Sequence, residues 1–220
     1  MGKITTLEVG KRDPSRVNVY LDGEYAFSLA LDDAVRLRKG QELTDADITA
    51  LKSVDAVVRA VDSASRFLAV RPRSIQEVRD NLMRKRFEDA AIEQALDKLQ
   101  ALGYLDDQAF AAFWVRERRA YKPLGARALR YELRQKGISE SIIREVLADV
   151  DAEEDALRAA QGQARKLRGL SRHEFRLKLG AFLQRRGFAY DDAARAVRQL
   201  QAEIEADDPS FWQTEQEDEL

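Results

Sequence analysis

The spacing of hydrophobic residues changes near residue 30 of the chain. Before that point, two short β-prone runs, residues 4–9 and 17–21, flank a turn-like GKRDPS segment, and Asp22-Gly23 leads into the aromatic run EYAFSL. Asp-Gly between two such runs is a strong hairpin signal. The pattern predicts a β-hairpin or a three-strand meander. Because three strands alone are marginally stable, we expect this element to pack on a neighbouring helix.

From residue 31 onward, apolar residues recur at helical spacing. The run LDDAVRLRKG predicts a short helix that ends at Gly40. Thr44 and Asp47 then form a predicted capping box at the start of the next helix. The periodic apolar face of that helix continues until Pro72 breaks the pattern.

One arrangement of apolar residues occurs three times in the rest of the chain. Leu82, Leu133 and Leu183 lie 51 and 50 residues apart, and each has an apolar neighbour four residues before it and five residues after it. Each is then followed by an apolar quartet with the spacing 3-1-3, which forms one buried stripe of a helix. The quartets are Ile92, Ala95, Leu96 and Leu99; Ile143, Val146, Leu147 and Val150; and Ala193, Ala196, Val197 and Leu200.

Each copy of this arrangement predicts a unit of three helices. Capping boxes begin the middle helix at Ser74 in the first unit and at Ser171 in the third. Gly137 and Gly187 follow the middle helix where a left-handed C-terminal cap is expected. Arg86 takes that place in the first unit, so it either accepts about 1–2 kcal/mol of strain in a left-handed turn or uses another geometry.

These signals predict a mainly α protein: three tandem three-helix repeats in an extended array, with a small β-hairpin or three-strand extension at the N-terminus. Repeats of this length are typical of stacked units around a thin, continuous core. The predicted segments are a β-rich extension with short helices, the three repeats, and an acidic tail expected to be disordered. Their ranges are 1–53, 54–103, 104–151, 152–205 and 206–220.

The composition fits a helical protein that folds in water. Of 220 residues, 35% are charged and 45% hydrophobic, which is too apolar for a disordered chain. The sequence has no cysteine, so it forms no disulfide, as is usual in a reducing cytosol. It also contains no apolar run typical of a signal peptide or a membrane span. We therefore expect a cytoplasmic monomer with no membrane partner.

The net charge of −2 conceals an uneven distribution of charge. Residues 203–220 carry eight acids and no base, which leaves 37 bases against 31 acids, a net charge of +6, in the rest of the chain. A basic body favours an anionic partner, and an acidic tail can compete for the same surface. A solvated surface with a frayed end is an equally good interpretation of the tail.

Catalytic patterns are absent from the sequence. The single histidine, His173, lies inside a predicted capping box, and there is no phosphate loop, nucleophile elbow or Cys/His metal spacing. Paired aspartates could hold a divalent ion, but Asp106 and Asp191 lie where helix caps are expected. We therefore predict that the protein is not an enzyme and that it uses no cofactor and no metal.

Basic residues are the candidates for partner binding. Three clusters, at 84–86, 134–136 and 185–186, fall at the ends of the three middle helices, where cations oppose the negative end of the helix dipole. They could also form repeated cationic patches. In the segment 110–136, basic residues alternate with tyrosines, as in many nucleic-acid or protein contact surfaces. The candidates are Arg84, Lys85, Arg86, Arg116, Arg119, Tyr121 (the predicted hot spot), Lys122, Arg127, Arg130, Arg134, Lys136, Arg185 and Arg186.

The pattern RPRSIQEVRDNLMRKRF…ALGYLDDQAFAAFWVRERRAYKPLGARALRYELRQKGI resembles the RecX family of bacterial regulators. The likeness covers about residues 64–202, and its most specific part is GYLDD, followed by an aromatic and basic helix, a glycine-containing turn and LRQKGI. The first sixty residues are similar to the N-terminal extension of longer members. The first helix of the third unit, rich in alanine and glutamine, departs most from the pattern.

The resemblance implies a fold and a function. It implies three three-helix repeats curved into an extended molecule, and a regulator of recombination, DNA repair and the SOS response. Such a regulator lodges in the groove of the RecA filament on single-stranded DNA and inhibits ATP hydrolysis and strand exchange by RecA. Some members also bind DNA directly. A helical module that binds single- or double-stranded DNA without RecA is the alternative hypothesis.

Overall fold

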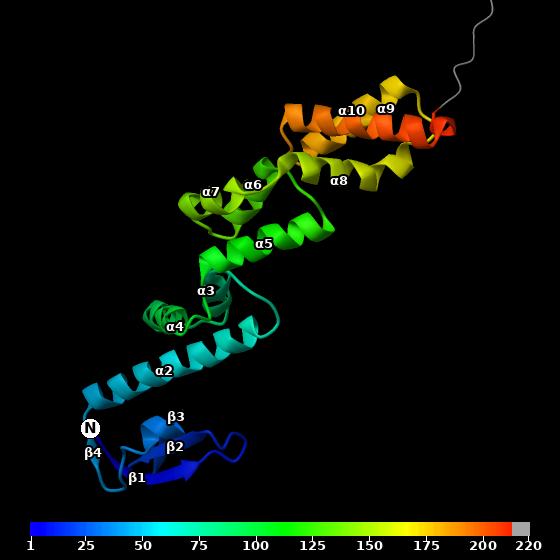
Figure 1. Cartoon of the computed structure of the whole chain (residues 1–220). Coiled ribbons are helices and arrows are strands. Elements are labelled where there is room, and N and C mark those ends of the chain that lie inside the picture. Colours follow the sequence, from blue (N-terminus) through cyan, green and yellow to red (C-terminus); the bar gives the residue numbers. More distant parts are fainter. Residues whose placement is uncertain (213–220) are drawn as a thin grey trace, which may run out of the picture. The chain divides into compact units, whose positions relative to one another are not determined.

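The computed structural model describes residues 1–212 of the chain (Figure 1). Its internal contacts divide the chain into two compact units, with the division between Asp106 and Asp107. The N-terminal unit holds a small sheet and the first three-helix repeat. The C-terminal unit holds the second and third repeats. Within residues 1–212, none of the helices combines the length and the apolarity that crossing a membrane requires.

The N-terminal sheet contains four antiparallel strands in the order β3-β2-β1-β4. They are β1 (Gly2–Val9), β2 (Arg16–Leu21), β3 (Glu24–Ala30) and the two-residue β4 (Glu42–Leu43). Asp22 and Gly23 connect β2 to β3, and both have positive φ, of 50° and 94°. Two successive positive φ angles are typical of the type I′ hairpin turn, for which Asp-Gly is a favoured pair. The predicted hairpin is confirmed, and β4 adds a fourth strand.

Helices α1 (Leu31–Ala34) and α2 (Asp45–Leu68) pack on the sheet (Figure 1). Ile4, Val19 and Leu29 of the sheet are fully or almost fully buried, in a core that α2 completes. The Asp55 carboxylate of α2, 7% exposed, accepts a hydrogen bond of 2.8 Å from Arg16 of β2 and one of 3.0 Å from Arg59. The sheet therefore packs on a neighbouring helix, as expected.

The first repeat shares a helix with this sheet. Helix α2 begins at the predicted Thr44 capping box and runs through the predicted boundary at residues 53 and 54. Its second half packs with α3 (Ile75–Arg84) and α4 (Asp89–Ala101). The predicted capping box at Ser74 begins α3. The extension and the first repeat are therefore joined through one continuous helix.

The second unit contains two further three-helix repeats. One consists of α5 (Asp107–Tyr121), α6 (Ala126–Gln135) and α7 (Glu140–Ala148). The other consists of α8 (Ala152–Ala164), α9 (Arg172–Arg185) and α10 (Tyr190–Asp207), with the short 3₁₀ helices η1 (Arg165–Leu167) and η2 (Pro209–Phe211). The buried residues of each repeat within residues 1–212 form a cluster of their own. The structure thus has separate cores in place of the continuous core that we predicted.

All three middle helices end in the same hydrogen-bonded turn. In the first repeat, the amide of Arg86 donates to the Met83 carbonyl and that of Phe87 to the Leu82 carbonyl. This pattern is the Schellman motif, and it recurs after Leu133 and Leu183. Its left-handed position is taken by Arg86 with φ 63°, and by glycine in the other repeats. The arrangement that occurs three times in the sequence therefore includes the end of the middle helix and the apolar residue that follows its turn.

The third repeat is closed by residues that we assigned to the acidic tail. Helix α10 continues to Asp207, and Phe211 and Trp212 are buried beyond it. The Trp212 ring meets the Phe175 ring edge-on at 5.1 Å, and the Gly169 amide donates to the Phe211 carbonyl at 2.9 Å. Residues 206–212 thus belong to the third repeat, because two large apolar side chains fill its core. The rest of the predicted tail, 213–220, lies outside the described residues.

Candidate partner-binding surface

The first basic cluster lies at the end of α3 in the N-terminal unit. The Arg84 Nε donates to the Asp80 carbonyl at 3.3 Å, and the Lys85 Nζ donates to Ser63 Oγ at 2.6 Å. Arg86 is exposed in its left-handed conformation. These contacts fit the dipole interpretation of the cluster, since two of its side chains interact with neighbouring helices or with the helix that they end.

The basic residues of α5 have different environments. Arg116 is exposed, and its guanidinium lies 5.7 Å from the Phe113 ring centre. Arg119 instead joins two repeats, because its Nε donates to Asp155 Oδ2 of α8 at 2.6 Å. Asp155 is fully buried, and its Oδ1 has no hydrogen-bond partner within the described residues. Burial raises the pKa of Asp155, and Arg119 opposes that shift.

Two arginines of α6 are partly neutralised by one carboxylate. Arg130 and Arg134 both pair with Glu140, at 3.2 and 2.8 Å, and Lys136 lies 5.0 Å from the Trp114 ring centre. Such contacts reduce the charge that these three side chains present to an anion. Tyr131, on the same helix, is 65% exposed.

The C-terminus of α9 meets the N-terminus of α6, which joins the third repeat to the second. The Gly125 amide donates to the Arg186 carbonyl at 3.0 Å, and the Arg127 amide donates to the Gly187 carbonyl at 3.3 Å. Two side chains cross in opposite directions: Arg127 donates to the Gln184 carbonyl at 2.6 Å, and Arg186 to the Pro123 carbonyl at 3.1 Å. The backbone donors at the start of α6, whose N-cap has no side chain, thus find acceptors at the end of α9.

Two glycines allow this close approach. A Cβ on Gly125 would lie 2.2 Å from the backbone nitrogen of Phe188, and a Cβ on Gly187 would lie 2.5 Å from that of Ala128. Both neighbours are backbone atoms that cannot rotate away. Sequence reasoning placed Gly187 correctly as a helix cap, but it did not detect this second role or the contact of Gly125.

Four cations lie in the two segments that form this contact, and we call them the junction cluster: Lys122, Arg127, Arg185 and Arg186. None of the four is ion-paired to a carboxylate within residues 1–212. Arg186 is half-buried, its guanidinium lies 4.9 Å from the Phe182 ring centre, and burial lowers its pKa. Tyr121, directly before Lys122, is 83% exposed. The arrangement presents positive charge that no carboxylate of residues 1–212 neutralises, on two segments that are joined by hydrogen bonds.

The structure offers little support for a metal site in residues 1–212. That part of the chain contains no group of three or more histidine, aspartate or glutamate side chains that could hold an ion. Asp106 stands directly before α5, where a cap was expected. The N-cap of α10 is Ala189, so the expectation that Asp191 caps this helix is wrong. Asp191 lies in the first turn, where a carboxylate still favours the helix dipole.

Comparison with known proteins gives one consistent result. Four family models match the chain: the regulatory protein RecX N-terminal domain at residues 2–44, and the first, second and third RecX three-helix domains at 60–99, 106–147 and 151–197. The regulatory protein RecX of Bacillus licheniformis is 36% identical over 92% of this chain and 79% of its own length. That of Bacillus subtilis is 34% identical over 93% and 79%.

Solved structures agree with the sequence comparisons. A crystal structure of regulatory protein RecX covers 92% of this chain and 100% of its own, with a TM-score of 0.72 and 29% identity. RecX from Lactobacillus salivarius, at 22% identity, shares the fold over 68% of this chain and 99% of its own, with a TM-score of 0.61. The chain therefore belongs to the RecX family of regulatory proteins.

Proposed function

We propose that this protein binds the RecA filament on single-stranded DNA and inhibits ATP hydrolysis and strand exchange by RecA. Membership of the RecX family supports a regulatory role, and the resemblance to RecX suggests RecA as the target. The observation that carries the proposal is the junction cluster, in which four cations lie on two hydrogen-bonded segments and pair with no carboxylate of residues 1–212.

The proposed binding mode depends on many weak contacts. A single exposed cation contributes little, because water screens its interaction with an anion. Cations that are fixed by a shared backbone lose less conformational entropy on binding than independent side chains do. Contacts with several neighbouring subunits of one filament then add through avidity. Binding along the filament would hold it in a state that neither turns over ATP nor exchanges strands.

The alternative function is a DNA-binding helical module that acts without RecA. Exposed Tyr121 and Tyr131 near the cationic residues favour it, since aromatic side chains stack on unpaired bases. Salt separates the two hypotheses. Binding through about four phosphates would lose roughly 50-fold in affinity for single strands, and roughly 150-fold for duplex DNA, between about 50 and 200 mM salt.

The test is the rate of ATP hydrolysis by RecA on single-stranded DNA as the protein is added at physiological salt. We expect the wild type to inhibit, and we expect Lys122→Glu/Arg185→Glu to require at least about tenfold more protein for the same effect. Both side chains are exposed and make no contact that holds the junction. Arg144→Glu/Arg198→Glu, which changes the same charge at exposed positions elsewhere, is the matched control.

Each result has a distinct meaning. Equal loss in both double variants would show that only net charge matters and would remove the junction cluster from the proposal. A wild type that leaves RecA activity unchanged but binds DNA with the salt dependence above would support the alternative function. If Tyr121→Ala inhibits as well as the wild type does, the assignment of Tyr121 as the hot spot is wrong.

A further inference from the structure

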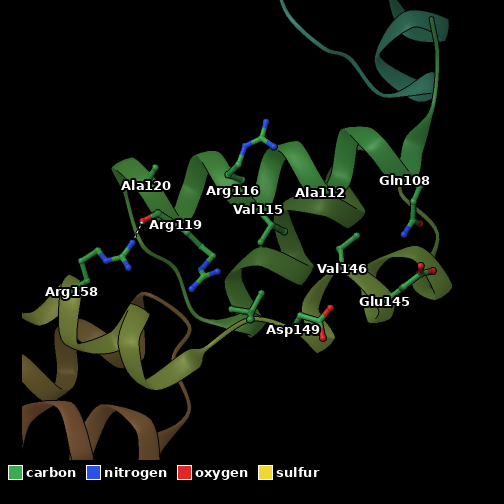
Figure 2. A pocket seen from close by; sticks show the side chains of 11 residues that line it. Gln108, Ala112, Val115, Arg116, Arg119, Ala120, Glu145, Val146, Asp149 and Arg158 are labelled. Atoms are coloured by element: carbon green, nitrogen blue, oxygen red, sulfur yellow. Dashed lines mark hydrogen bonds between the residues drawn. The ribbon is translucent and has the colours of Figure 1, made fainter. Parts of the chain in front are cut away.

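A groove with a volume of about 560 Å³ lies between α5, α7 and α8 (Figure 2). One face of α5, from Gln108 to Ala120, forms its long wall. At a rise of about 1.5 Å per residue, that face is roughly 18 Å long, which is about three turns of a helix. The groove therefore has the length of a short helical segment.

The floor of the groove is apolar and built from small side chains. Ala112 and Val115 of α5 face Val146 of α7 across it. Val115 is buried, whereas Ala112 is exposed in the structure as it stands. Small side chains let the backbone of an incoming helix approach closely, and the apolar surface gains from being covered.

Charged side chains line the groove toward both ends and also along its α5 wall, where the exposed Arg116 lies (Figure 2). Glu145 of α7 lies toward the Gln108 end, and Asp149, directly after α7, lies nearer the middle. Both are exposed without an ion pair within residues 1–212. Arg119 and Arg158 lie toward the Ala120 end. Arg158 pairs with Glu154 at 2.7 Å and donates to the Arg119 carbonyl at 3.2 Å, so its position is fixed.

The pairing of its charges distinguishes the groove from the junction cluster. Arg119 and Arg158 are already paired with Asp155 and Glu154, whereas Arg116, Glu145 and Asp149 have no ion pair within residues 1–212. A nucleic acid would bring phosphates against those carboxylates and would leave the apolar floor without a matching surface. A protein segment with apolar residues in its centre and opposite charges at its ends matches all three features.

We propose that this groove binds an amphipathic helix of a protein partner. The helix places apolar side chains one turn apart on Ala112, Val115 and Val146. A lysine or arginine at one end meets Glu145 and Asp149, and a carboxylate at the other end meets Arg158. The proposal rests on the proposed function for the identity of the partner, which is the RecA protein itself. In this proposal the groove contacts a protein helix, and the junction cluster contacts anionic groups.

The direct test places the photo-crosslinking residue p-benzoylphenylalanine at position 112, and at 202 as a control, in the full chain mixed with RecA on single-stranded DNA. Ala112 and Ala202 are both exposed on helix surfaces, but only Ala112 lines the groove. We expect a crosslink to RecA from position 112 and none from position 202. A crosslink from position 112 to DNA alone would overturn the proposal.

Inhibition assays supply the second readout. Ala112→Trp fills the groove and should raise the half-inhibitory concentration at least about tenfold, whereas Ala202→Trp should change it less than about twofold. Circular dichroism checks whether both variants are folded. If the wild type inhibits RecA and Ala112→Trp inhibits it equally well, the groove proposal is overturned and the proposed function is left intact. A crosslink to RecA from p-benzoylphenylalanine at position 112, together with a wild type that does not inhibit RecA, supports the groove and overturns the proposed function.

Discussion

The contact between α9 and α6 makes Gly125→Ala an informative substitution. Gly125 has φ −72°, which alanine adopts without strain, so the local helix start tolerates the change. The added methyl group would meet the carbonyl carbon and oxygen of Gly187 at 2.3 Å, in backbone that belongs to the other repeat. The methyl group can be accommodated only if the two repeats move apart.

Movement of the second and third repeats away from each other would remove the two backbone and two side-chain hydrogen bonds between α6 and α9 and their flanking residues. At a net value of about 0.5–1.5 kcal/mol each, their loss lowers the free energy of unfolding by about 2–6 kcal/mol. Each repeat keeps its own buried cluster, so helix content should persist in the folded variant. The loss should therefore appear as weaker coupling between the two repeats.

Urea unfolding followed by circular dichroism measures this change, and amide hydrogen exchange locates it. The amides of Gly125 and Arg127 should exchange faster in Gly125→Ala than in the wild type. Gly180→Ala is the matched control, because a Cβ at that position in α9 meets nothing within 4 Å. The control should gain about 0.5–1 kcal/mol. Unchanged exchange at both amides, with an unfolding midpoint equal to that of the wild type, would refute the assignment of the junction.

Three further substitutions test separate parts of the structure. Arg86→Gly should raise stability by roughly 0.5–1 kcal/mol, because relief of the left-handed backbone exceeds the entropy cost of glycine, and a lower melting temperature would contradict this. Trp212→Ala should lower the free energy of unfolding by about 3–5 kcal/mol, and an unchanged unfolding midpoint would show that residues 208–212 do not close the third repeat. Burial raises the folded pKa of Asp155 above the unfolded value of 3.8, so its carboxyl adds stability as pH falls through the folded pKa and loses it as pH rises. The unfolding free energy of the wild type should therefore increase relative to Asp155→Asn as the pH is lowered from neutral toward the unfolded value of 3.8, and a difference independent of pH would contradict the shift.

Local signals predicted the fold because each acts over a few residues. The Asp22-Gly23 turn, the capping boxes at Thr44, Ser74 and Ser171, and the apolar residue after each middle helix all satisfy hydrogen bonds within one turn of the chain. The predicted boundary at residue 53 falls inside α2, because this helix packs in two neighbouring cores, a feature that has no local signal.

The candidate surface was harder to predict because charge alone does not show which cations are already paired. Arg119 pairs with a residue 36 positions away in the sequence, and the side chain of Arg127 contacts a residue 57 positions away. Sequence periodicity contains no information about such distant pairs. Phe211 and Trp212 did carry a signal, since two adjacent aromatic residues among acids are unusual for a solvated segment. The assignment of the thirteen candidate residues to a partner stays a prediction.

The dependence of α6 on α9 sets an order for biosynthesis. The backbone groups at the start of α6 find their acceptors in residues that are translated about sixty positions later, since Pro123 and Arg186 are 63 residues apart. At about 5–20 residues per second, a ribosome needs roughly 3–12 s to make that stretch. Until then, water molecules must accept the hydrogen bonds of the Gly125 and Arg127 amides. The nascent second repeat therefore emerges with an unfinished helix start, and synthesis of the third repeat completes it.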